Sequence, residues 1–113
     1  MVNKYVPSRG DVIWIDFDPQ AGTELQKRRP ALVLSPYKYN KLSSLVIVCP
    51  ITSQKRARAF EVPVPDSYNL KGVILAAQIR SVDWKARNAK LECKLPEDVV
   101  SEVVDKIAAL LED

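Results

Sequence analysis

Six short apolar runs divide the first 95 residues, and polar residues, glycine or proline separate them. The runs are residues 11–17, 31–35, 45–51, 60–64, 72–80 and 90–95. Short runs at this close spacing predict β-strands rather than helices. Residues 11–17 are apolar at successive positions, which predicts a central strand buried on both faces. Phe60, Val62 and Val64 alternate with Glu61 and Pro63, which predicts a half-buried edge strand.

Two of these runs carry further detail. Pro50 interrupts residues 45–51, so we expect an edge strand, a bulge or a strand end there. In residues 90–95, the alternation predicts that Leu91, Cys93 and Leu95 face one side and that the intervening charged residues face the other. Short helical turns are expected at residues 38–44 and 81–85.

The last segment has a different period. Pro96 suits a first helical position, and the two acids that follow it favour a helix N-terminus. Val99, Val103, Ile107 and Leu111 then recur every four residues, which predicts an amphipathic helix that packs on the sheet or on a second subunit. Many short strands and one terminal helix predict a mainly β fold, a small barrel with a C-terminal helix. A length of 113 residues fits a single domain spanning residues 1–113.

Composition narrows the class of protein. The hydrophobic fraction of 47% is enough for one core, and no apolar run is long enough to span a membrane. The N-terminus lacks the apolar run of a signal peptide, so we expect a cytoplasmic protein with no membrane partner. Residues 95–113 hold six acids and one base, whereas the preceding residues hold sixteen bases and eight acids. A basic body suggests a polyanionic partner, although a solvated basic surface explains the charge equally well.

The chain contains no histidine, and this excludes several kinds of site. Neither a Ser-His-Asp hydrolase nor a two-histidine ribonuclease is possible, because both need an imidazole. Cys49 and Cys93 alone provide too few ligands for a zinc site, so we expect no metal and interpret both thiols as small buried hydrophobic groups. With three isolated glycines, no glycine-rich phosphate loop exists, and no cofactor is expected.

One polar loop contains candidate catalytic residues. Residues 18–30 lie between two predicted strands and place Glu24 close to Lys27, Arg28 and Arg29. Cations can stabilise charge on phosphoryl oxygens while a carboxylate accepts a proton. Taken alone, however, the composition of this loop is better explained by a solvated basic surface.

An ordered set of motifs changes this interpretation. The motifs are YVP (5–7), GDVIWIDFDP (10–19), GTE (22–24), RPALVLSP (29–36), YN (39–40), VCPIT (48–52), FEV (60–62) and QIRSVDWKAR (78–87). In their order and spacing they resemble the MazF/PemK/Kid toxin family. The resemblance runs from about Lys4 to Arg87 and weakens in the predicted final helix.

The resemblance implies an SH3-like barrel, a homodimer and metal-independent cleavage of single-stranded RNA. It also implies inhibition by a cognate MazE-like antitoxin whose acidic, disordered tail occupies the RNA groove. Arg29 and Thr52 match the two central catalytic positions of the family, and Glu24 matches a carboxylate position in close relatives.

Chemical reasoning assigns roles to these three residues. Without a metal, the ribose 2′-hydroxyl can attack the adjacent phosphorus and leave a cyclic phosphate and a 5′-hydroxyl. Arginine stays protonated and is a poor base, so we expect Glu24 to act as base and Arg29 to stabilise the phosphorane and donate to the leaving group. Thr52 offers a hydroxyl donor. The alternatives are a surface acid at Glu24 and a strand-end cap at Thr52.

Further residues are expected to hold the RNA. Phe17 either stacks on a base or packs in the core, and Trp84 is expected in the core or at a dimer interface. The other expected RNA-binding residues are Ser53, Gln54, Lys55, Arg56, Arg58, Gln78, Arg80 and Arg87. Among these, Gln78 carries the donor and acceptor that reading a base edge requires.

The chain departs from the family pattern at three positions. Arg28 replaces a histidine found in one branch, Ala77 replaces a common acid, and Asn88 replaces a common glycine. We expect these changes to affect the partner surface and the tolerated base, and they leave Glu24, Arg29 and Thr52 in place.

Two other classes of protein remain as alternatives. One is a gyrase-poisoning toxin of the CcdB type without RNase activity, whose Trp-Gly-Ile end this chain lacks, since it ends Leu110-Leu111-Glu112-Asp113. The other is a catalytically silent RNA-binding barrel, which intact catalytic positions disfavour.

Overall fold

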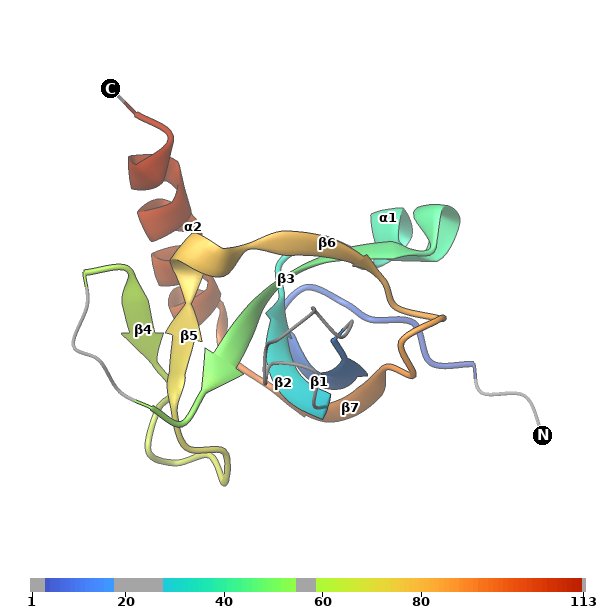
Figure 1. Ribbon diagram of the computed structural model, residues 1–113, viewed down its shortest axis with the longest axis horizontal. Helices are drawn as coiled ribbons and strands as arrows, with labels where there is room; N and C mark the ends of the chain where they lie inside the picture. The colour runs from blue at the N-terminus through green and yellow to red at the C-terminus, as the bar shows by residue number, and fades with distance from the viewer. Residues whose placement is uncertain (1–3, 18–27, 55–58, 113) are drawn as a thin grey trace, which may run out of the picture.

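The computed structural model describes residues 4–17, 28–54 and 59–112. Four residues expected in the site, Glu24, Lys55, Arg56 and Arg58, lie outside these ranges. The described chain forms seven strands, two α-helices and one 3-10 helix (Figure 1). In chain order they are β1 (Asp11–Asp16), β2 (Arg28–Val33), α1 (Tyr37–Ser43), β3 (Leu45–Thr52), β4 (Glu61–Pro63), β5 (Val73–Leu75), the 3-10 helix η1 (Ala76–Gln78), β6 (Arg80–Asp83), β7 (Lys90–Lys94) and α2 (Glu97–Leu110).

All described strand pairs are antiparallel and form one curled sheet. The hydrogen-bonded order is β4-β5-β3-β2-β1-β7, and β6 also pairs with β3. Figure 1 shows β6, β3, β2, β1 and β7 curving around a common centre, with α2 outside the curve. The hydrogen-bonded path does not close among the described strands, but the arrangement is the expected SH3-like barrel with a C-terminal helix.

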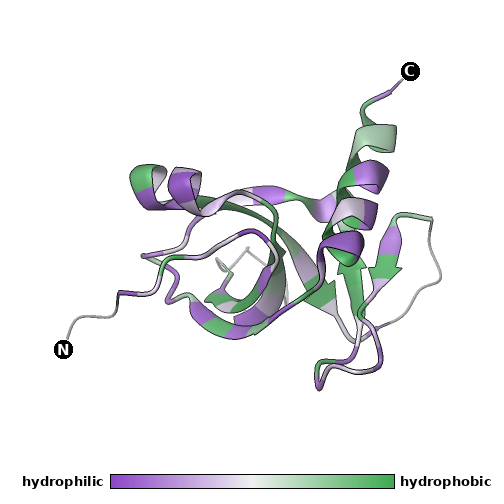
Figure 2. Ribbon diagram, turned by 180° about the vertical axis from the view of Figure 1, so that it is seen from behind, coloured by the Kyte–Doolittle hydropathy of each residue, from purple (hydrophilic) through white to green (hydrophobic). Residues whose placement is uncertain are grey.

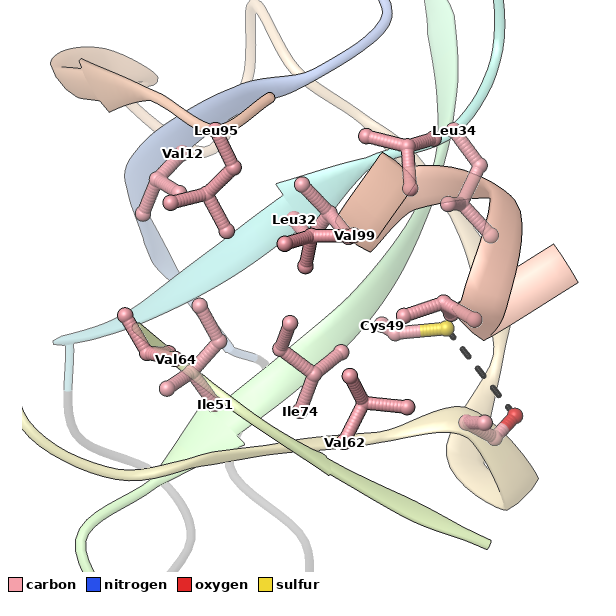
Figure 3. Close-up of a cluster of buried hydrophobic side chains, with 13 residues drawn as sticks. Val12, Leu32, Leu34, Cys49, Ile51, Val62, Val64, Ile74, Leu95 and Val99 are labelled. Atoms are coloured by element: carbon pink, nitrogen blue, oxygen red, sulfur yellow. Dashed lines mark hydrogen bonds between the residues drawn. The ribbon is translucent and has the colours of Figure 1, made fainter. Parts of the chain in front are cut away.

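The two faces of the curled sheet carry separate cores. Figure 2 shows the apolar stretches of the strands in green. The outer core lies between the sheet and α2 and includes Ile51, Ile74 and Val100 (Figure 3). The inner core includes Ile15, Val48 and Trp84. Because side chains alternate along a strand, β1, β2 and β3 each contribute to both cores.

Most predicted elements are confirmed. β1 pairs with both β2 and β7, as expected for a central strand, and β4 is the first strand in the sheet order, as expected for an edge. The turn expected at residues 38–44 is the helix α1. In α2 the residues Val99 and Val103 are buried, whereas Leu111 lies past the helix end and is 81% exposed.

The single strand expected over residues 72–80 is wrong. The segment forms β5, then η1, and only then β6. β5 pairs with β3 at Ile51 and Thr52, and β6 pairs with β3 from Leu45 to Val48. Between these two ladders lies Pro50, which has no backbone N–H to donate, and the chain facing it leaves the sheet as η1. Pro50 therefore marks an interruption within a central strand, and the edge-strand alternative is wrong.

Three smaller expectations also fail. The helical turn expected at residues 81–85 is instead largely β6, where Val82 alternates with exposed neighbours. The predicted loop 18–30 ends earlier than expected, because Arg28 already belongs to β2. In β7, Leu91 is 48% exposed rather than facing the core. Val12 pairs with Cys93 and Ile13 with Leu91, so a bulge interrupts the alternation there.

Candidate functional site

The strand register brings Arg29 and Thr52 to the same end of the inner face. Ala31 on β2 pairs with Pro50 on β3, and Leu32 pairs with Cys49. Continuing this antiparallel register by two residues places Arg29 opposite Thr52. Arg29 shares the side of β2 that carries the inner-core residue Ala31. The continued register thus places two residues that are far apart in the sequence near each other, one at the start of β2 and the other at the end of β3.

Arg29 has an unusual environment for an arginine. It pairs with Ile15 of β1 and is half-buried. Its Nε atom is buried and has no hydrogen-bond partner, and it is the only such side-chain atom found in the described part of the chain. Buried donors are almost always satisfied, so an unpaired one calls for an acceptor that arrives from outside. A phosphate oxygen is a suitable acceptor for a guanidinium group.

Thr52 is held in place by its backbone and by a close neighbour. Its Oγ1 accepts a hydrogen bond of 3.2 Å from the backbone N–H of Gln54. A Cβ added at Gly72 would lie 2.4 Å from the Thr52 carbonyl oxygen, and Gly72 has a φ of +143°. Only glycine therefore allows this approach of the two strands. The hydroxyl is used locally as an acceptor, and its proton remains available for donation.

Phe17 and Arg80 form a cation–π pair on the inner side. Phe17 follows β1, is 6% exposed and belongs to the inner core. The Cζ atom of Arg80, on β6, lies 5.2 Å from the centroid of the Phe17 ring. The structure therefore places the ring in the core and beneath a guanidinium group.

The remaining expected RNA-binding residues fall into two groups. Ser53, Gln54 and Gln78 are exposed, with the first two directly after Thr52 and Gln78 at the end of η1. Arg87 is half-buried, and its Nη1 donates a hydrogen bond of 3.0 Å to the backbone oxygen of Asp16. Arg87 therefore also links the turn after β6 to β1.

A polar clasp that the sequence did not reveal lies beside Arg29. Asp16 accepts hydrogen bonds from Arg28 (2.9 Å) and from the side-chain amide of Asn88 (2.7 Å). Arg28 also donates to the backbone oxygen of Asn88, at 2.5 Å. These bonds, chiefly from Asn88 and then from Arg28, lower the pKa of the Asp16 carboxyl. We call Asp16, Arg28 and Asn88 the clasp.

The clasp brings together Arg28 and Asn88, two of the three positions at which the chain departs from the family pattern. Asn88 has a φ of +57°, a left-handed conformation that glycine and asparagine tolerate best. The signal in the sequence was this asparagine, which stands where the family resemblance leads us to expect glycine. What the sequence did not supply was the contact of Asn88 with Arg28, which is 60 residues away.

Several other features of the described chain bear on the site. Cys49 and Cys93 are free thiols, and burial raises the pKa of Cys49 to about 12. No cluster of three potential metal ligands occurs within residues 4–17, 28–54 and 59–112. Within the same ranges, neither helix is long and apolar enough to cross a membrane.

Comparison with known proteins defines the class to which this fold and site belong. Residues 8–111 match the family of PemK-like, MazF-like toxins of type II toxin–antitoxin systems, and the chain belongs to this family. The endoribonuclease toxin MazF of Escherichia coli K12 is 40% identical over 111 residues, which cover 98% of this chain and 99% of the relative.

Solved structures agree with this assignment. The crystal structure of MazF from Deinococcus radiodurans matches with a TM-score of 0.89 and 45% identity, over 96% of this chain and 98% of that one. A MazE–MazF crystal structure from the same organism matches with a TM-score of 0.87 and 45% identity, over 95% and 97%. The family inferred from the sequence motifs is confirmed.

Proposed function

We propose that this chain is the toxin of a type II toxin–antitoxin system and an endoribonuclease that cuts single-stranded RNA at short sequences without a metal ion. The observation that carries the proposal is the buried, unpaired Nε of Arg29, opposite Thr52 in the continued register. Relatives from Escherichia coli are named endoribonucleases, which supports the same activity here and disfavours a gyrase-poisoning function. Cleavage of messenger RNA in the cytoplasm stops translation and growth. Residues 1–113 act as a single toxin domain.

The proposed reaction is an internal transfer at phosphorus. The ribose 2′-oxygen loses its proton and forms a bond to the adjacent phosphorus, while the bond from phosphorus to the 5′-oxygen breaks. The products are a 2′,3′-cyclic phosphate and a 5′-hydroxyl, whose oxygen must receive a proton. No water, metal or cofactor enters this step.

Arg29 stabilises the negative charge that builds on the phosphoryl oxygens. Its Nε and neighbouring N–H groups form a planar set of donors that matches two phosphate oxygens at once. A preorganised donor of this kind is commonly worth about 3–4 kcal/mol of barrier reduction. Thr52 adds one hydroxyl donor from the facing strand.

Proton removal needs a base, and histidine is absent from the chain. An arginine held protonated is a poor acceptor, so Glu24 is assigned as the base that takes the 2′-hydroxyl proton. Arg29 then gives a proton to the leaving 5′-oxygen and is reprotonated by the proton that Glu24 accepted, so that no proton is gained or lost overall.

The RNA would be held by the residues that surround this pair. Phosphates contact the basic residues after Thr52, namely Lys55, Arg56 and Arg58, together with Arg80 and Arg87. Ser53, Gln54 and Gln78 read base edges. Phe17 contributes by supporting Arg80, since its own ring is in the core.

Two protein partners complete the proposal. Matching structures are titled as MazE–MazF complexes, which supports a MazE-like antitoxin as partner of this chain. Its acidic, disordered tail would compete with RNA for the same cations. A second copy of the chain forms a homodimer.

The test is a digest of a long single-stranded RNA by the purified chain with a chelator present. We expect fragments that carry a 5′-hydroxyl and a cyclic phosphate, and sequencing their 5′ ends gives the cleaved motif. Full-length RNA that remains bound to the protein would favour the silent RNA-binding barrel. Full-length, unbound RNA would refute the proposal altogether.

A further inference from the structure

A basic hollow lies beside the candidate site and is not used by the proposed reaction. It has a volume of about 660 Å³ and is formed by the N-terminal segment 4–6, by α1 and by the turn after β6. Each of these three segments contributes one lysine: Lys4, Lys41 and Lys85.

Among the described residues, no carboxylate neutralises the charge of this hollow. None of the residues that line it is acidic, and none of the three lysines forms an ion pair with a carboxylate of a described residue. Three ammonium groups around one hollow create a positive potential that attracts an anion.

The two aromatic residues that line the hollow, Tyr5 and Trp84, already make contacts within the protein, so little of either ring is left for a base to stack on. The Trp84 ring is 7% exposed and its Nε1 donates to the backbone oxygen of Asn40 at 2.9 Å. The Tyr5 hydroxyl donates to Asp11 at 2.5 Å. The Nζ of Lys85 lies 5.6 Å from the centroid of the Trp84 ring. The groups available to a ligand are therefore mainly cations, which fit phosphates better than bases.

The hollow is linked to the clasp through Asn88. Asn88 lines it and also donates to Asp16, which in turn is paired with Arg28, the residue before Arg29. Along β6 and one residue past its end, the four steps from Arg80 to Trp84 span about 13 Å at a rise of about 3.3 Å each. A strand of RNA held at Arg29 and Arg80 needs only a few more nucleotides to reach the lysines.

We propose that this hollow binds the sugar–phosphate backbone of the RNA that flanks the cleaved motif. The inference rests on the proposed endoribonuclease function and adds to it a subsite that is independent of sequence. Lys4, Lys41 and Lys85 contact phosphates outside the motif, so they raise affinity for long RNA without taking part in bond cleavage.

The test compares RNAs of two lengths with a double variant. A short RNA carries little more than the cleaved motif, and longer RNAs extend it on the 5′ or the 3′ side. For the parent chain we expect one extension to lower KM several-fold with kcat unchanged. Lys41→Ala/Lys85→Ala should abolish that benefit, while its kcat/KM on the short RNA stays at the parent value. Loss of two phosphate contacts should also reduce the slope of log Kd against log salt by about 1.4.

The matched control is Lys38→Ala/Lys71→Ala, which removes the same charge from α1 and from an exposed loop without touching the hollow. It should keep the length benefit. The inference is overturned if Lys41→Ala/Lys85→Ala still shows a lower KM for the longer RNA, which is the result expected if the hollow binds an acidic peptide instead. It is also overturned if the control variant loses the effect of RNA length to the same extent. A parent chain that cuts neither RNA refutes the proposed function itself.

Discussion

The guanidinium carbon of Arg80 lies 5.2 Å from the centre of the Phe17 ring, although the two residues are 63 positions apart on β6 and after β1. Phe17 is almost fully buried, and Arg80 is half-buried without an ion pair to any described residue. The ring therefore restrains the guanidinium group on the inner side of the sheet, where its charge remains available to a phosphate.

The first prediction concerns this pair. Arg80→Lys keeps the charge but loses the planar set of donors that fits a phosphate, so RNA binding should weaken by about 1–2 kcal/mol, roughly 5- to 30-fold in Kd. Fluorescence anisotropy on a labelled single strand measures the change, in the Arg29→Ala background to prevent cleavage. An unchanged Kd for the lysine variant would show that only the charge of Arg80 matters.

The second prediction concerns Arg29. Arg29→Ala should lower the cleavage rate far more than tenfold, a barrier increase above about 1.4 kcal/mol. Because its Nε has no partner in the described structure, the stability should change little, by about 0.5 kcal/mol or less. Single-turnover cleavage and urea unfolding measure the two quantities. Arg29→Lys is the matched variant, and near-normal cutting by the alanine variant would reject the role.

The third prediction concerns the support of Thr52. Gly72→Ala introduces a Cβ that would lie 2.4 Å from the Thr52 oxygen and strains a φ of +143°. We expect a loss of about 1–3 kcal/mol in stability together with a loss of kcat. Gly10→Ala is the control, because it strains a φ of +94° but meets its nearest atom, the Leu95 oxygen, at 3.4 Å. The control should lose stability and keep kcat, and equal losses of kcat would contradict the assignment.

The fourth prediction concerns pH. Hydrogen bonds from Asn88 and Arg28 lower the pKa of Asp16 in the folded chain. A lowered folded-state pKa gives stability that is present above the unfolded value of about 3.9 and is lost as pH falls through the folded value. Urea midpoints at pH 7 and pH 3 should therefore differ less in Asp16→Asn than in the parent chain. Asp66→Asn, in an exposed loop, should behave like the parent, and an unaltered pH dependence in Asp16→Asn would exclude a contribution from the clasp.

Much of the fold was predictable because burial follows local periodicity. The double-sided apolar pattern of β1 and the four-residue period of α2 each reflect one dominant packing surface, so the sequence alone indicated them. The segment from Gly72 to Arg80 was not predictable in this way. Its apolar residues predict one continuous strand, whereas the structure has a break between β5 and β6. The break lies beside Pro50 of β3, and this neighbour is brought there only by folding.

The candidate site was predicted from the sequence only in part. Arg29 and Thr52 were identified by resemblance, and the register that places them opposite each other is a property of the sheet. Asp16 and Asn88 were missed because a hydrogen bond between residues 72 positions apart leaves no periodic signal. Phe17 had two open interpretations, and only its burial beneath Arg80 favours the core.

Because β2 and β3 place alternate side chains in the two cores, the activity of the protein depends on the correct register between these strands. A slip of one residue between these strands would turn Arg29 toward α2 and separate it from Thr52. A chain misregistered in this way would carry every residue of the toxin and none of its activity. Growth inhibition would therefore report the number of correctly folded molecules rather than the number synthesised.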